Sequence, residues 1–178
     1  FGGEMDLAIA IRTGVIKEHS THPKRSIFDL LRNDMFVLPS AALVSRKAFD
    51  AVGGFDPQFM GYEDDDLFLR IFRKGYSNHF VDKAVTVWCI HTASTSFSIR
   101  MLRSRFKYFK KLLQMFPDEH QRGRYYLREY LMPRFQVFFV NEVIEAIKKD
   151  DQYRDEMSAV LDEYAAVVFA NPYVGRKK

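Results

Sequence analysis

The chain carries four consecutive acids, from Glu63 to Asp66, at the start of an amphipathic stretch. Apolar residues recur behind them at three- and four-residue spacing, which is typical of a helix. A carboxylate that is ionised at neutral pH can accept the proton of an incoming hydroxyl, so the run is a candidate general base. Acids at a helix start also complement the helix dipole and cap its free N–H groups. Composition alone leaves both roles open.

Helical geometry separates the members of this run. Asp66 lies one turn before Arg70 and is expected to form an ordinary surface ion pair with it. Asp64 lies on the same face as the apolar Phe68, so its carboxylate is expected to point inward or into a cleft. Asp64 is therefore the acid best placed for chemistry.

The flanking residues carry a family resemblance. A turn of sequence Gly53-Gly54-Phe55-Asp56 precedes the helix Glu63-Asp64-Asp65-Asp66-Leu67. This order resembles the family 2 glycosyltransferases, in which Gly-Gly-Phe-Asp leads to Glu-Asp-x-Asp-Leu, and the match covers roughly residues 36–95. The resemblance implies an α/β fold. Residues 1–96 would be the C-terminal half of a GT-A catalytic domain, and residues 97–178 an all-α extension.

The resemblance also implies an inverting single displacement. Asp64 would be the general base, acting on a hydroxyl of a saccharide or lipid-linked acceptor. The donor would be a nucleotide sugar, UDP-linked, and the substrate-binding residues would be Glu63, Gly54 and Ser40. The segment that holds Ser40 is equally compatible with a buried strand and its turn.

His91 is the candidate metal ligand. It follows an apolar run and precedes a Ser/Thr-rich loop, and the resemblance implies that it helps to hold a divalent ion, Mn²⁺ or Mg²⁺. A lone His at a strand end is more often a polar terminus, because a metal site needs several ligands. His19 and His22 are three residues apart in a polar loop beside Pro23, and are expected to be solvated.

Two features of the GT-A pattern are missing from the sequence. Neither a nucleotide-binding βαβ half nor a separate Asp-x-Asp metal motif is visible. We therefore expect the chain to be a portion of a longer enzyme, with the donor-binding half before Phe1. Two other classes stay open: a non-catalytic interaction or membrane-surface module, and a metal-dependent hydrolase.

The expected elements follow from periodicity and from Gly and Pro positions. Helices are expected over residues 26–33, 46–52, 63–74, 98–116, 122–149 with a kink at Pro133, and 152–170. Strands are expected over residues 6–11, 79–81 and 85–90, with extended pieces at 36–38 and 42–44.

Charge is segregated along the chain. Residues 98–134 hold ten bases and three acids, whereas residues 137–163 hold eight acids and three bases, which suggests different partners. In the first segment bases and aromatic residues interleave between Arg103 and Leu113. This pattern fits a helix with one core face, or a helix on an anionic membrane surface. Nucleic acid is not expected, because no recognised binding motif accompanies the charge.

The cysteine content and the hydropathy of the sequence predict the cellular compartment of the protein. The single cysteine, Cys89, excludes an internal disulfide framework and fits a reducing compartment. No stretch approaches the roughly 18 apolar residues that a membrane-spanning helix needs. We expect a cytoplasmic protein, with a peripheral position at the inner face of the membrane.

Overall fold

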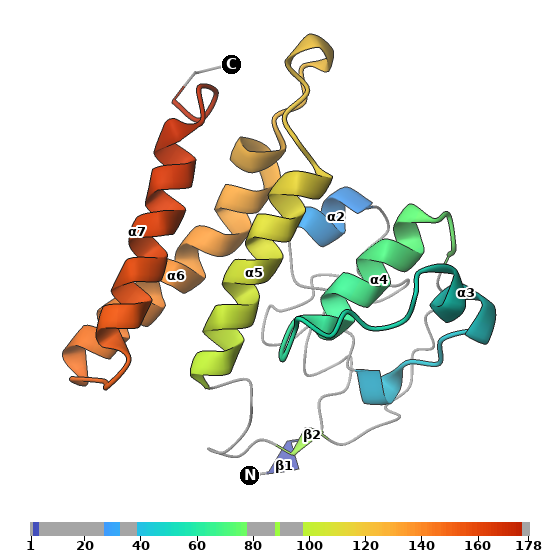
Figure 1. Cartoon of the computed structure of the whole chain (residues 1–178), viewed down its shortest axis with the longest axis horizontal. Coiled ribbons are helices and arrows are strands. Elements are labelled where there is room, and N and C mark those ends of the chain that lie inside the picture. The colour runs from blue at the N-terminus through green and yellow to red at the C-terminus, as the bar shows by residue number, and fades with distance from the viewer. Residues whose placement is uncertain (1, 4–26, 33–38, 78–87, 90–97, 176–178) are drawn as a thin grey trace. The chain divides into compact units, whose positions relative to one another are not determined.

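The computed structural model describes residues 2–3, 27–32, 39–77, 88–89 and 98–175 (Figure 1). The chain divides into two compact units, one formed by residues 1–30 and 34–98 and the other by residues 31–33 and 99–178. The helices are α2 (Ile27–Arg32), α3 (Arg46–Ala51), α4 (Glu63–Arg73), α5 (Ile99–Met115), α6 (Met132–Lys148) and α7 (Arg154–Ala170). The strands β1 (Gly2–Gly3) and β2 (Trp88–Cys89) pair antiparallel.

The predicted α/β GT-A fold is wrong for the described residues, which are mainly helical. Their only sheet is the pair of two-residue strands β1 and β2. Residues 42–44, expected to be extended, follow a 3₁₀ turn over Pro39–Ala41 and join no sheet, and Leu43 is fully exposed. A short apolar run indicates a strand only weakly, because a strand also needs partners for its backbone. Most of the other predicted strand residues lie outside the described part.

The first unit places α3 against α4. The hydroxyl of Ser45 caps α3 by accepting a hydrogen bond from the amide of Ala48 at 3.1 Å. The helix ends before Gly53 and Gly54, whose φ angles of 77° and 71° lie in the left-handed region that favours glycine. Leu67 of α4 packs in an apolar cluster with Ala48. Both helices agree with the sequence prediction to within one residue.

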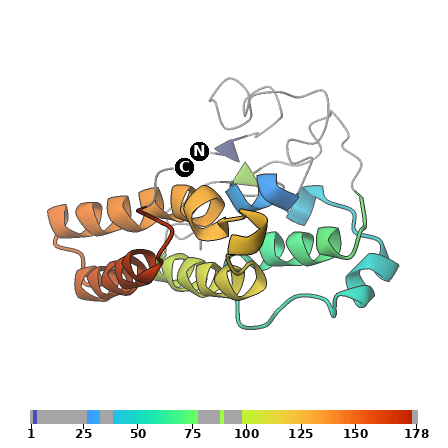
Figure 2. The same ribbon diagram turned by 90° about the horizontal axis from the view of Figure 1, so that it is seen from above.

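The second unit is held together by an aromatic core. Helices α5, α6 and α7 lie side by side in both views (Figures 1 and 2). The buried rings at their centre are Tyr108, Phe109, Phe135, Phe139 and Tyr164. Neighbouring ring centroids among them are 5.0–6.3 Å apart. Offset and edge-on contacts at these distances add to the gain from area burial.

The segregated charges of the sequence meet inside the second unit. Bases of α5 pair with acids of α6 and α7: Arg103 with Glu156, Arg105 with Glu142, and Lys110 with Glu163. Part of the basic segment therefore faces the acidic segment of the same chain rather than a separate partner.

The basic aromatic helix α5 turns its aromatic side chains to the core. Phe106, Tyr108 and Phe109 are all buried, whereas Lys107 is exposed. The prediction that this helix packs one face against the core is confirmed. Any contact with an anionic membrane would use its basic side chains, because these aromatic rings are buried. Within the described part of the chain, no helix is both long and apolar enough to cross a membrane.

The start of α6 differs from the continuous helix expected over residues 122–149. Gly123 is left-handed, with φ 63°, and a π-helical turn over Leu127–Leu131 precedes α6. Pro133 has no N–H to donate to the carbonyl of Glu129, four residues earlier. That carbonyl accepts a hydrogen bond from the Arg32 guanidinium at 3.3 Å instead. Before Pro133 the backbone thus forms a π-helical turn, and a side chain from outside this helix donates to the Glu129 carbonyl.

Candidate active site

The acidic run begins at a strained backbone position. Tyr62 is the N-cap residue of α4 and is left-handed, with φ 65°, directly after Gly61 at φ 135°. A bulky residue in this region typically costs about 1–3 kcal/mol and persists only where the surroundings hold it. Tyr62 is buried, with 6% of its surface exposed. The chain therefore enters α4 in a fixed direction, which orients the acids that follow.

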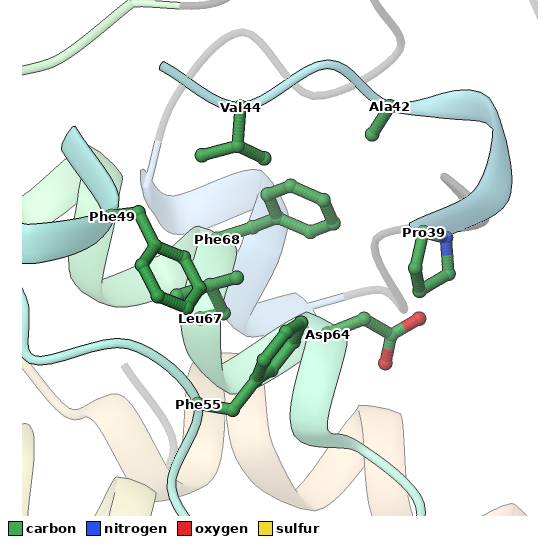
Figure 3. A pocket seen from close by; sticks show the side chains of 8 residues that line it. All are labelled: Pro39, Ala42, Val44, Phe49, Phe55, Asp64, Leu67 and Phe68. Atoms are coloured by element: carbon green, nitrogen blue, oxygen red, sulfur yellow. The ribbon is translucent and has the colours of Figure 1, made fainter. Parts of the chain in front are cut away.

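Asp64 lies in the first turn of α4 and is partly buried. Its Oδ1 accepts a hydrogen bond from the backbone N–H of Asp65 at 2.9 Å. The positive end of the helix dipole favours an anion at this position. Asp64 also lines a pocket together with Leu67 and Phe68 of the same helix (Figure 3). The cleft-facing position that helical spacing predicts for Asp64 is what the structure shows.

The pocket is small and almost entirely apolar. Its volume is about 210 Å³. The lining residues are Pro39, Ala42, Val44, Phe49, Phe55, Asp64, Leu67 and Phe68. Figure 3 shows the phenylalanine rings around the space, with the Asp64 carboxylate on the side of Pro39. One carboxylate among aromatic walls suits a ligand that has both an apolar face and hydroxyl groups.

Glu63 presents a second carboxylate beside Asp64. The residue is partly buried, and its Oε2 is inaccessible and has no hydrogen-bond partner among the described residues. A buried acceptor without a donor typically costs about 1–3 kcal/mol. Because this oxygen is inaccessible and Glu63 does not line the pocket, its substrate-binding role stays a prediction.

The other two predicted substrate contacts have different positions. Ser40 is exposed in the 3₁₀ turn beside the pocket, and only its neighbours Pro39 and Ala42 line the wall. Gly54 is buried, and a Cβ there would lie 2.9 Å from the Phe49 ring. Gly54 therefore lets the turn approach Phe49 closely, and a direct contact of Gly54 or Ser40 with substrate stays a prediction.

An ion pair under the site differs from the sequence prediction. Asp66 and Arg70 do pair, at 2.8 Å, but Asp66 is fully buried and Arg70 is only 18% exposed, so this is not a surface pair. The Arg70 guanidinium also donates to the carbonyls of Val52 and Gly54. The four-residue spacing in the sequence predicts the Asp66–Arg70 pair. The contacts of Arg70 with the two carbonyls could not be predicted, because they depend on how the preceding turn packs against α4.

The predicted metal ligand His91 lies outside the described residues. Among the residues that the structure does describe, no three His, Cys, Asp or Glu side chains come together as a metal site. Asp66, the other acid in D-x-D spacing with Asp64, pairs with Arg70. The described residues alone do not fit a divalent-ion site.

The comparison with known families concerns the same segment. Residues 40–92 match the family model described as the N-terminal domain of galactosyltransferase. The matched range includes Asp64, the pocket residues from Ala42 to Phe68, and His91. No curated protein and no solved structure matches the chain. The match supports a glycosyltransferase domain, without singling out family 2.

Proposed function

We propose that the chain is the acceptor-side part of an inverting glycosyltransferase of the family 2 type, and that Asp64 is its general base. The observation that carries the proposal is the Asp64 carboxylate at an apolar pocket, inside the segment that matches a galactosyltransferase domain. The donor is a UDP-linked sugar, with UDP-galactose as the first to test because of that match. The acceptor is a saccharide or a lipid-linked saccharide.

The proposed reaction is a single displacement. The Asp64 carboxylate takes the proton of an acceptor hydroxyl as its oxygen bonds to the anomeric carbon of the donor. The bond between that carbon and the diphosphate oxygen breaks, and the nucleoside diphosphate leaves with the electron pair. Attack opposite to the leaving group inverts the anomeric configuration.

The walls of the pocket support an acceptor sugar. The rings of Phe49, Phe55 and Phe68 offer apolar surface for the C–H face of a pyranose. Glu63, next to Asp64 in the first turn of α4, would accept a hydrogen bond from a second hydroxyl of the same sugar. Two carboxylates on one helix turn thus have separate roles: Glu63 orients the sugar, and Asp64 removes the proton.

A divalent ion, Mn²⁺ or Mg²⁺, is proposed as a cofactor that involves His91. Such an ion supplies Lewis-acid stabilisation of a diphosphate leaving group. The described residues do not by themselves form a site for this ion. The reaction steps above therefore use only side chains of the protein and none involves the ion. Loss of transfer on chelation with EDTA, and recovery with Mn²⁺ or Mg²⁺, would support the requirement, and full activity in EDTA would contradict it.

A donor-dependent transfer assay tests the proposal. The protein expressed from its whole coding frame is incubated with UDP-galactose or another UDP sugar and a panel of saccharide acceptors. We expect release of UDP that requires acceptor and a product of inverted configuration. Hydrolysis of esters that needs metal but no sugar donor would favour a hydrolase, and saccharide binding without turnover would favour a non-catalytic module. Either result would overturn the proposal.

Cytoplasmic location at the inner face of the membrane remains part of the proposal. Exposed bases such as Arg100 and Lys107 on α5 would provide the contact with anionic lipid. Vesicles that contain anionic phosphatidylserine should retain the protein at low salt and release it at high salt. Equal retention by neutral vesicles, or none by either, would contradict this location.

A further inference from the structure

One arginine connects the glycine turn of the first unit to the helix that carries the acids. Arg70 donates from Nε to Asp66 Oδ2 at 2.8 Å, from Nη1 to the Val52 carbonyl at 2.6 Å, and from Nη2 to the Gly54 carbonyl at 2.7 Å. The two carbonyls lie 18 and 16 residues before Arg70. A single planar group thus joins three points of the chain.

This arrangement needs an arginine. The guanidinium presents several N–H donors in a fixed fork, whereas a lysine ammonium is a single compact donor centre on a flexible stem. Asp66, which is fully buried, fixes the Nε side of the fork. Charge-assisted hydrogen bonds are stronger than neutral ones, and water has little access to compete for them here. Arg70 therefore restrains the position of the turn relative to α4.

The turn in question carries a wall of the pocket. Phe55 directly follows Gly54, is 47% exposed, and stands edge-on to Phe49 with ring centroids 5.6 Å apart. It lines the pocket together with Asp64, as Figure 3 shows. Since Asp64 and Arg70 belong to one helix, the tether to Gly54 sets where the Phe55 ring stands relative to the Asp64 carboxylate.

We infer that Arg70 is a positioning residue for the acceptor sugar. It acts through the carbonyls of Val52 and Gly54 to hold the Phe55 ring at the spacing from Asp64 that one sugar ring requires. Phe55 is then the apolar platform for the sugar, and Arg70 touches neither substrate nor the reacting atoms. The inference rests on the proposed transferase function.

The test compares Arg70→Lys with Arg73→Lys, an equal change at an exposed position of the same helix. We expect Arg70→Lys to raise the acceptor KM by about 10- to 100-fold, because small displacements of positioning groups have effects of this size. The donor KM and the kcat at saturating acceptor should change little. Arg73→Lys should leave all three constants unchanged.

A double variant separates positioning from a merely structural role. If Arg70 acts through the Phe55 ring, Arg70→Lys should add little to the acceptor KM of Phe55→Leu, whereas independent effects would multiply. Amide hydrogen exchange at Gly53 and Gly54 should also be faster in Arg70→Lys, while the amides in the middle of α4 keep their protection.

The outcomes identify which proposal fails. A lower Tm in Arg70→Lys with an unchanged acceptor KM, or effects that multiply in the double variant, would overturn the positioning role while the active wild type keeps the proposed function. A wild-type protein that transfers no sugar from any donor would overturn the proposed function itself, and the positioning role with it.

Discussion

The two units use different means to hold their helices in place. The helical unit after residue 98 fills its centre with large rings, such as Phe109 and Phe135, which are fully buried. Around the candidate site, the backbone takes left-handed conformations at Gly53, Gly54 and Tyr62, and the partly buried Arg70 donates hydrogen bonds to two carbonyls. Side-chain volume stabilises the helical unit, whereas backbone geometry and hydrogen bonds define the surroundings of the candidate site.

This difference indicates where substitutions will act. A ring removed from the aromatic core leaves a cavity that lowers stability, and none of these core rings lines the pocket. A small change in the glycine turn moves a wall of the pocket at a lower cost in stability. The following variants test that contrast.

The largest effect is expected from Phe135→Ala in α6. Phe135 is fully buried between Tyr108 and Phe109, so its loss should lower the free energy of unfolding by about 3–5 kcal/mol. Urea denaturation followed by circular dichroism measures the change. Val137→Ala, on the same helix but 53% exposed, is the control and should change stability far less. Similar losses of unfolding free energy in both variants would contradict the claim that the aromatic core stabilises this unit.

An intermediate effect is expected from Gly54→Ala. The new Cβ would lie 2.9 Å from the Phe49 ring and would hold an unfavourable φ of 71°, so we expect a loss of about 1–3 kcal/mol and weaker acceptor binding. Gly53→Ala has a similar φ of 77°, but its Cβ would meet nothing within 4 Å. Gly53→Ala should therefore have a similar backbone strain but leave the shape of the pocket unchanged. Equal acceptor KM values in the two variants would show that Phe49 does not shape the site.

The smallest effect concerns an exposed ion pair. The Arg103 guanidinium beside Glu156 lowers the pKa of that carboxyl below its usual value of 4.5. Because the folded pKa is the lower one, the contribution to stability is present above pH 4.5 and is lost as pH falls through the folded pKa. The stability difference between wild type and Glu156→Gln should shrink over this range, though it is small because the pair is exposed. Asp162→Asn, an exposed acid of the same helix, is the matched control, and an equal pH dependence in it would contradict the assignment.

The helices were predictable because their signals are local. Apolar spacing in α4, α5 and α7 placed their ends within two residues of the observed bounds, since side chains three and four apart share a face. The same spacing placed Asp64 beside Phe68, which is its position at the pocket.

The remaining features depend on contacts that spacing does not contain. The left-handed Tyr62 is unusual for a bulky residue and has no sequence signal comparable to glycine. The bonds from Arg70 to Val52 and Gly54 require the fold of the turn, and the Arg32 donor to Glu129 comes from 97 residues away. Short apolar runs do not show which segments pair in a sheet: Trp88 and Cys89 of the predicted strand 85–90 do pair, whereas residues 42–44 join no sheet.

The central claim is that the Asp64 carboxylate removes the acceptor proton, and one pair of variants tests it most directly. Asp64→Asn keeps the shape of the side chain but loses the base, so turnover with UDP sugar and acceptor should be abolished while donor binding by calorimetry is kept. Asp65→Asn makes the same change one residue further along α4, outside the pocket lining, and should retain turnover. Wild-type turnover in Asp64→Asn would contradict the account.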